Sequence, residues 1–126
     1  MNARILVIED NAKNLKLVRD VLQYVGYEVI EARTGEEGLE AAQRCAPDLV
    51  LMDLQLPGID GTETLRRLRR LGQRDMPVVA VTAFAMREDR ERALDAGFDG
   101  YLEKPISVRA FPGQVEAFLH GQVTTT

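Results

Sequence analysis

The sequence is poor in the residues that most often build disulfides, metal sites and catalytic triads. It contains one cysteine, Cys45, one histidine, His120, and no tryptophan among 126 residues. A single cysteine excludes a disulfide within the chain and is typical of a reducing compartment, so we expect a cytoplasmic location. A lone histidine near the end of the chain argues against a histidine-rich metal centre or a histidine-centred triad. Any chemistry must therefore come from carboxylates, hydroxyls and lysine.

Long apolar runs and an excess of positive charge are also missing. No stretch approaches the roughly 20 apolar residues that cross a bilayer, and no signal-peptide pattern follows Met1. The net charge is −4, whereas nucleic-acid binding depends on positive charge. We therefore expect neither a membrane nor direct contact with nucleic acid. The one basic cluster is interpreted first as a solvated helix face and second as a site for an acidic protein; it comprises Arg66, Arg67, Arg69, Arg70 and Arg74.

Length and patterning indicate one α/β domain. With 45% hydrophobic and 29% charged residues, the chain can form a single core. Residues 1–120 are predicted to form the domain, and residues 121–126 a flexible tail. Short β-rich runs at residues 4–8, 28–32, 49–52, 78–81 and 100–103 alternate with helical segments. Because the third and fourth runs are apolar throughout, we expect a parallel sheet covered by helices on both faces, with the part-polar second run at an edge.

Four of the five predicted helices have clear boundaries. They occupy residues 11–25, 35–45, about 60–71 and 87–96. Capping patterns at Thr34 and Asp60 mark two starts, and Gly97 marks one end. The fifth contains Pro112, which is unfavourable inside a helix, so this helix starts either near Val108 with a break or at Pro112 itself.

Polar residues follow several of the predicted strands. The carboxyl ends of parallel strands lie at the same edge of a sheet, and ligands usually bind at that edge. The polar residues are Glu9, Asp10, Asp53, Thr82 and Lys104. Taken singly, the acidic pair is better explained as helix-capping charge, and the lysine as a solvated side chain. Taken together, clustered carboxylates need a cation, and oxygen ligands suit Mg²⁺. Asp53 is a plausible nucleophile for a phosphoryl group, with Lys104 offsetting its charge.

The same residues resemble the receiver domains of two-component response regulators. The motifs are Glu9-Asp10, Asp53 with its loop DLQLPGIDG, Thr82-Ala83, Lys104-Pro105, and Tyr101 three residues before the lysine. The resemblance covers the chain to about Leu119. The stretches EDNAKNLKL, VAVTAFAM and EKPIS most resemble stand-alone, single-domain receivers of cell division.

The resemblance implies a doubly wound, flavodoxin-like sheet with strand order 2-1-3-4-5. It also implies that Asp53 is the phosphoacceptor. Asp10, Asp53 and the backbone carbonyl of Gln55 would ligate Mg²⁺ directly, and Glu9 would act through water. The resemblance assigns the remaining roles by position: Thr82, Ala83 and Lys104 would bind phosphoryl oxygens, Tyr101 would be the switch that turns inward, and the Lys104–Pro105 peptide would be cis.

A receiver is a signalling protein rather than a turnover enzyme. It would catalyse its own phosphorylation from a phosphohistidine on a sensor histidine kinase or histidine phosphotransfer protein, lose the group slowly, and act on a downstream protein. Three alternatives remain. An aspartyl-phosphate phosphatase would need a second aspartate where Gln55 stands. A flavodoxin-like nucleotide binder would need amide donors where Glu9 stands. An unphosphorylated pseudo-receiver would act as a scaffold.

Overall fold

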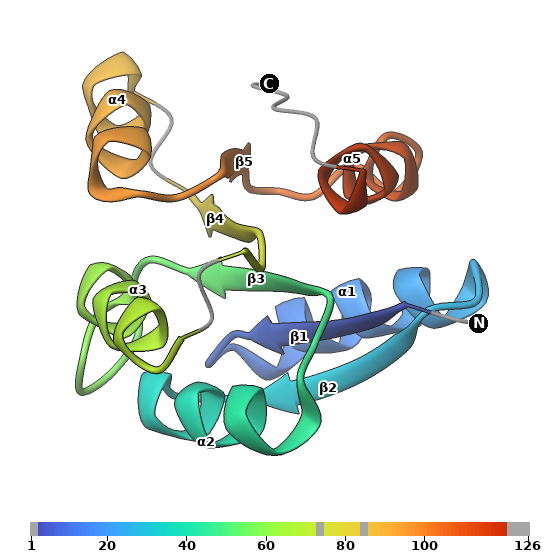
Figure 1. Ribbon diagram of the computed structural model, residues 1–126. Coiled ribbons are helices and arrows are strands. Elements are labelled where there is room, and N and C mark those ends of the chain that lie inside the picture. The colour runs from blue at the N-terminus through green and yellow to red at the C-terminus, as the bar shows by residue number, and fades with distance from the viewer. Residues whose placement is uncertain (1–2, 73–74, 84–85, 121–126) are drawn as a thin grey trace.

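Five parallel strands form one sheet in the order β2-β1-β3-β4-β5, as the computed structural model shows for residues 3–72, 75–83 and 86–120 (Figure 1). The order is the one that the resemblance implied. The strands are β1 (Arg4–Ile8), β2 (Glu28–Ala32), β3 (Leu49–Asp53), β4 (Val78–Thr82) and β5 (Gly100–Glu103). Every residue of β3 and β4 is buried, as expected for central strands, while β2 is partly exposed at an edge.

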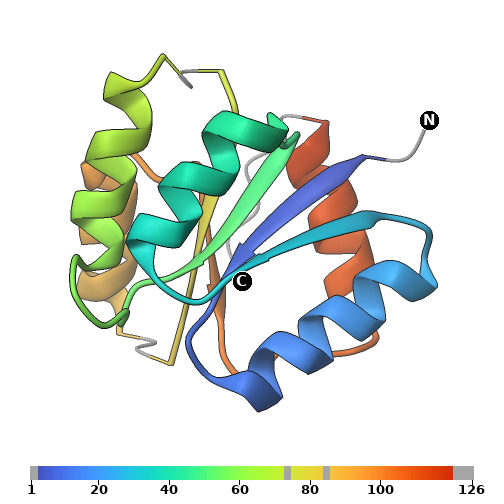
Figure 2. The same ribbon diagram turned by 90° about the horizontal axis from the view of Figure 1, so that it is seen from below.

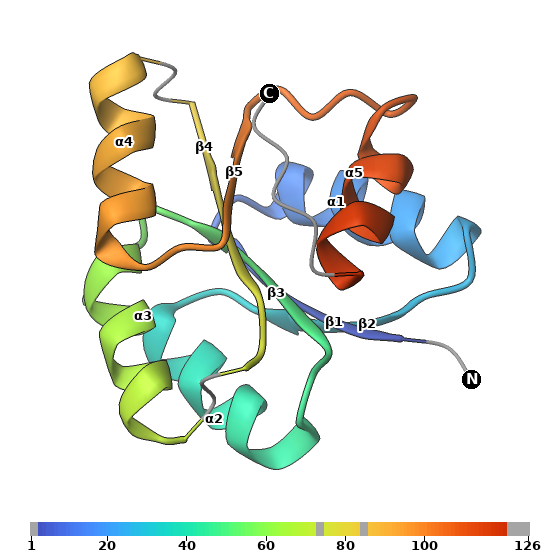
Figure 3. The ribbon, with the colours of Figure 1, turned by 45° about the horizontal axis from the view of Figure 1, so that its top comes forward.

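Helices cover both faces of the sheet and divide the core in two. They are α1 (Ala12–Tyr24), α2 (Gly35–Cys45), α3 (Gly61–Arg70), α4 (Arg87–Ala96) and α5 (Phe111–Leu119). Helices α1 and α5 lie on one face, and α2, α3 and α4 on the other (Figures 2 and 3). Apolar side chains of α1 and α5 pack with Ile5 and Val7, whereas those of the other helices pack with Leu6 and Ile8. Because successive side chains of β1 point to opposite faces of the sheet, this strand contributes to both halves of the core.

Side-chain caps fix the starts of three helices. The carboxamide oxygen of Asn11 accepts hydrogen bonds from the backbone of Lys13 and Asn14, so the helix predicted from residue 11 begins at Ala12. The predicted caps at Thr34 and Asp60 are both present, each accepting from the backbone N–H three residues later. These bonds satisfy amides that have no partner within the helix.

The two central strands extend one residue further than predicted. The expected ends at residues 52 and 81 were wrong because parallel pairing continues: Asp53 pairs with Val81, and Thr82 pairs with Glu103. Asp53 and Thr82 are thus the last residues of strands rather than the first residues of loops. Their positions are fixed by the sheet itself, not by the flexibility of a connecting segment.

The start of α5 resolves the two alternatives for Pro112. Helix α5 begins at Phe111 and leaves Val108 outside, so Pro112 lies in the first turn, where its missing N–H costs no helical hydrogen bond. The helix is therefore unbroken and starts one residue before the second of the two predicted positions.

Cys45, the last residue of α2, is partly buried. His120 is exposed directly after α5. None of the helices that the structure describes combines the length and hydrophobicity needed to cross a bilayer. The predicted tail at residues 121–126 and Arg74 lie outside the described residues.

Candidate functional site

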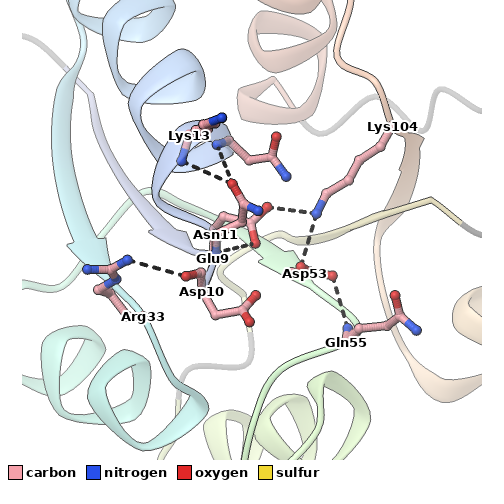
Figure 4. A network of polar contacts seen from close by, with 9 residues as sticks. Glu9, Asp10, Asn11, Lys13, Arg33, Asp53, Gln55 and Lys104 are labelled. Carbon is pink, nitrogen blue, oxygen red and sulfur yellow. Dashed lines mark hydrogen bonds and ion pairs between the residues drawn. The ribbon is translucent and has the colours of Figure 1, made fainter.

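One ammonium group joins two carboxylates at the carboxyl edge of the sheet. The Nζ atom of Lys104, which follows β5, donates to Oε1 of Glu9 at 2.7 Å and to Oδ2 of Asp53 at 3.0 Å. Figure 4 shows the lysine reaching across from β5 to the ends of β1 and β3. Residues far apart in the sequence therefore meet here because their strands end at the same edge.

Backbone amides hold the other oxygens of these carboxylates. Oδ1 of Asp53 accepts from the backbone N–H of Gln55 at 2.9 Å, and Oε2 of Glu9 accepts from the N–H of Asn11 at 3.2 Å. Glu9 and Asp53 are only 5% and 6% exposed. With each oxygen bonded, both carboxylates have fixed orientations in a partly dehydrated site.

Asp10 completes a group of three acids on the side of the site away from Lys104 (Figure 4). One oxygen from each of Glu9, Asp10 and Asp53 lies within 4.8 Å of the others. Asp10 is exposed, unlike the other two. The carboxylates of the predicted site are therefore brought together, with one of them open to solvent.

Arg33 is a neighbour of this site that the sequence analysis did not identify. Its Nη2 atom donates to the backbone carbonyl of Asp10 at 3.3 Å. Arg33 directly follows β2, and this place after a predicted strand is the signal in the sequence that points to it. Its contact holds the segment that carries Asp10, and it adds a cation beside the acids.

The pKa values of Glu9 and Lys104 are both raised, but for different reasons. Burial, reinforced by the nearby Asp53 carboxylate, raises the pKa of Glu9, and the hydrogen bond from Lys104 only partly offsets this. For Lys104, burial acts to lower the pKa, but its hydrogen bonds to Glu9 and Asp53 outweigh it and the pKa is raised. The lysine is thus held as a cation by the two carboxylates that it contacts.

The remaining predicted residues surround this centre. Thr82 is fully buried at the end of β4, and its carbonyl accepts from the backbone N–H of Lys104 at 2.8 Å. Ala83 follows it and is exposed. The Lys104–Pro105 peptide is cis, as the resemblance implied. The side chain of Gln55 is exposed, while its amide contacts Asp53.

Tyr101 is deeply buried in strand β5. Its ring is 2% exposed and belongs to the core beneath α3 and α4. Its hydroxyl has no hydrogen-bond partner among the described residues, and burial raises its pKa. The ring therefore lies inward in this structure, and its movement on phosphorylation stays a prediction.

The oxygen ligands fit a small divalent cation. Three carboxylates face one another here, and the only ammonium bonded to them among the described residues contacts two. Hard oxygen donors with an open side suit Mg²⁺, which retains several waters or phosphate oxygens in protein sites. Three carboxylates share one bonded ammonium in this described part of the chain, and this excess of negative charge is the physical reason that a cation is favoured.

Comparisons with known proteins agree with this geometry. A family model for the response regulator receiver domain matches residues 5–116. The polar-differentiation response regulator DivK of Brucella ovis is 43% identical over 120 residues, covering 94% of this chain and 98% of DivK. A CheY-like receiver domain protein from Methanospirillum hungatei JF-1 superposes with a TM-score of 0.86 at 32% identity, over 95% of both chains. The receiver domain of sensor histidine kinase PA1611 from Pseudomonas aeruginosa PAO1 has a TM-score of 0.85 and 33% identity, over 95% of this chain and 99% of that one; it holds a magnesium ion in its active site cleft.

Proposed function

We propose that this chain, which belongs to the response regulator receiver domain family, is a signalling switch whose state is set by a phosphoryl group on Asp53. Membership of the family makes it a component of two-component signalling rather than a conventional enzyme. The observation that carries the proposal is the position of Asp53. It ends a central strand, is bonded to Lys104 at 3.0 Å, and lies within 4.8 Å of two further acids.

The metal that fits the site is Mg²⁺. Asp10 and Asp53 would be direct ligands together with the backbone carbonyl of Gln55, and Glu9 would act through water. Bound there, the cation would offset the charge of the acids and of a phosphoryl group. The support is the cluster itself, since three carboxylates gather there and, within the described residues, the one bonded ammonium contacts only two of them.

The proposed phosphodonor is a phosphohistidine on a sensor kinase or a phosphotransfer protein. A carboxylate oxygen of Asp53 attacks phosphorus, an O–P bond forms, and the P–N bond to the imidazole breaks. The imidazole leaves with the electron pair of that bond and takes up a proton. Phosphoryl transfer mainly needs correct positioning and charge stabilisation. The amide of Gln55, bonded to Oδ1 at 2.9 Å, orients the attacking carboxylate.

Lys104 has the central role in stabilising the product. Its ammonium is bonded to Asp53 and Glu9 before transfer, and we expect it to bind a phosphoryl oxygen afterwards. The Thr82 hydroxyl and the Ala83 N–H, at the end of the adjacent strand, are proposed to bind the others. Their movement toward the phosphoryl group would alter the surroundings of Tyr101 and thus the surface that a downstream protein binds.

A phosphatase is a weaker alternative. Turnover of an aspartyl phosphate needs a general acid and base near the acyl phosphate. The side chain two residues after Asp53 is the exposed amide of Gln55, which cannot exchange a proton in this way. We therefore expect slow loss of the phosphoryl group, as suits a switch.

Phosphoramidate tests the proposal because it contains the same P–N bond as phosphohistidine. Wild-type protein, Asp53→Asn and the control Asp95→Asn would be incubated with it and Mg²⁺, with a parallel sample in EDTA. Borohydride would then reduce any aspartyl phosphate to homoserine, and peptide mass spectrometry would locate it. This trap detects acyl phosphates that are lost before an intact-mass measurement.

We expect homoserine at position 53 in the wild type and in Asp95→Asn, and none in Asp53→Asn or in EDTA. Asp95 is an exposed acid on α4, so its replacement controls for the loss of one charge. Homoserine at another position, or none in the wild type despite Mg²⁺ binding, would contradict the proposal and leave the scaffold alternative.

A further inference from the structure

A groove between α3 and α4 is unrelated to the carboxylate site. It has a volume of about 350 Å³ and is lined by Thr62, Leu65, Arg66, Arg69, Arg70 and Ala96. Helices α3 and α4 both begin at the edge of the sheet that carries Asp53 and run away from it (Figure 3). Since the lining includes Arg70 and Ala96, the last residues of their helices, the groove extends to the end of the molecule remote from Asp53.

The groove carries positive charge on an acidic protein. Helix α3 contains four arginines and one glutamate in ten residues, although the net charge of the chain is −4. Glu63 is paired with Arg66 and Arg67, and Asp99 with Arg69 at 2.9 Å. Arg70 is exposed and has no ion pair among the described residues. The charges of this surface are therefore incompletely balanced by the chain itself.

The position of the arginines indicates what would fit between them. Arg66 and Arg70 are one helical turn apart, about 6 Å along the axis. Arg69 is held in place by a second bond, from Nη1 to the carbonyl of Met76 at 2.7 Å. The floor between them is apolar, formed by the buried Leu65 and by Ala96. An occupant needs carboxylates on one side and an apolar side chain on the other.

We infer that this groove, defined here as the arginine groove, docks an acidic amphipathic segment of a partner protein. Two carboxylates of that segment would bind Arg70 and, in competition with Glu63, Arg66, and an apolar side chain would contact the exposed Ala96. Arginine presents a planar fork suited to carboxylates, which favours this pairing. The inference goes beyond the proposed function, because it assigns a surface and a partner chemistry that phosphorylation of Asp53 does not require.

A nucleic acid fits the same surface less well. Backbone phosphates are bound by continuous positive surfaces, with several contacts along the strand. Here the positive charge is confined to one helix, and Asp99 lies beside Arg69. The floor of the groove offers apolar atoms rather than further cations.

The test uses the full chain and a fluorescein-labelled helical peptide with glutamate on one face and leucine on the other. Binding would be measured by fluorescence anisotropy in low salt and repeated in high salt. The variant is Arg66→Glu with Arg70→Glu, and the matched control is Arg44→Glu with Arg87→Glu. The control arginines are exposed on α2 and α4, so both proteins undergo the same change in net charge.

We expect the peptide to bind the wild type and the control, with affinity falling in salt, and to bind the Arg66/Arg70 variant at least about tenfold more weakly. No binding to the wild type, or equal loss in variant and control, would overturn the inference. Tighter arginine-dependent binding of a labelled single-stranded oligonucleotide would overturn it in favour of nucleic acid. Borohydride trapping of phosphorylated Asp53 in the same variants tests the proposed function separately. Neither Arg66 nor Arg70 belongs to the site of Glu9, Asp10 and Asp53, so phosphorylation should persist in the Arg66/Arg70 variant even where the peptide no longer binds.

Discussion

Glu9, Asp53 and Lys104 show how one cation is shared where several acids are buried. Each carboxylate alone would lose hydration without adequate compensation. Two of them share the ammonium of Lys104, at 2.7 and 3.0 Å, while Asp10 meets solvent. The site, as far as the structure describes it, therefore shares one ammonium among three acids, and the negative charge that remains favours the binding of a cation.

Magnesium should stabilise the folded chain through Asp10. A ligand that binds only the native state adds about 2.7 kcal/mol at a concentration one hundred times its dissociation constant. We expect Mg²⁺ to raise the melting temperature of the wild type and of Asp95→Asn, and to have little effect on Asp10→Asn. Calorimetry across a magnesium series would measure this. An equal shift in Asp10→Asn would show that the ion binds elsewhere.

Glu9 should make stability depend on pH in a defined direction. Its pKa is raised in the folded protein by burial, so the native state favours the protonated carboxyl more than the unfolded state does. Its contribution to stability is therefore greatest below the ordinary pKa of glutamate and decreases as pH rises through the raised value. Glutamine mimics the protonated form. The stability of Glu9→Gln relative to wild type should thus increase with pH.

Urea denaturation in EDTA, at several pH values from acid to neutral, would measure that difference. Glu28→Gln, an exposed position on β2, provides a control for removal of one glutamate. A difference between Glu9→Gln and wild type that is constant with pH, or that falls as pH rises, would contradict the assignment of burial as the dominant cause.

At the scale of elements, α3 and α5 each have a glycine in the first turn, and the two glycines differ in the space around them. A Cβ at Gly61 would lie 2.9 Å from the Cα of Leu54 and 3.1 Å from the carbonyl oxygen of Asp53, so backbone would have to move. A Cβ at Gly113 would meet nothing within 4 Å. The first glycine permits α3 to pack against the end of β3. The second has no packing reason visible in the structure.

These surroundings predict opposite effects for the same substitution. Gly113→Ala should stabilise the protein by about 0.5–1 kcal/mol, because alanine has the better helix propensity. Gly61→Ala should destabilise it by roughly 1–3 kcal/mol through overpacking, and it should slow phosphorylation by displacing Asp53. Denaturant unfolding and the borohydride trap would measure the two effects. Destabilisation by Gly113→Ala would refute the account of α5.

At the scale of the whole molecule, the sheet separates two apolar cores that depend on the same strands. Ile5 and Ile8 are both fully buried in β1, but Ile5 packs under α1 and α5 while Ile8 packs under the other helices. They are about 10 Å apart along the strand. Neither half can form without the sheet, so we expect one cooperative unfolding transition.

Trimming each core by one methyl group should give additive losses. Ile5→Val and Ile8→Val are each expected to cost about 0.5–1.5 kcal/mol, and the double variant the sum, because the side chains share no packing partners. Leu71→Ala, at a residue 44% exposed, should change stability by no more than about 0.5 kcal/mol. Separate transitions in the double variant would contradict a single cooperative unit. A strongly non-additive loss would show that the two side chains are energetically coupled.

Much of the architecture follows from local patterns. Apolar runs predict the central strands because a strand buried on both faces needs apolar side chains throughout. Capping residues such as Thr34 and Asp60 predict helix starts, since an unpaired amide needs a nearby acceptor. The strand ends limited the search to a few polar residues, and the family resemblance supplied the strand order.

The tertiary structure decided what depends on distance rather than pattern. Nothing local indicates that Lys104 contacts Glu9, which lies 95 residues away, or that Arg33 holds the carbonyl of Asp10. The ends of β3 and β4 were set by pairing with neighbouring strands, and the depth of Tyr101 by the helices above it. The sequence by itself determined the elements, because their propensities are local. Only folding determined how charges separated along the chain compensate one another, because electrostatic interactions depend on separation in space and on burial.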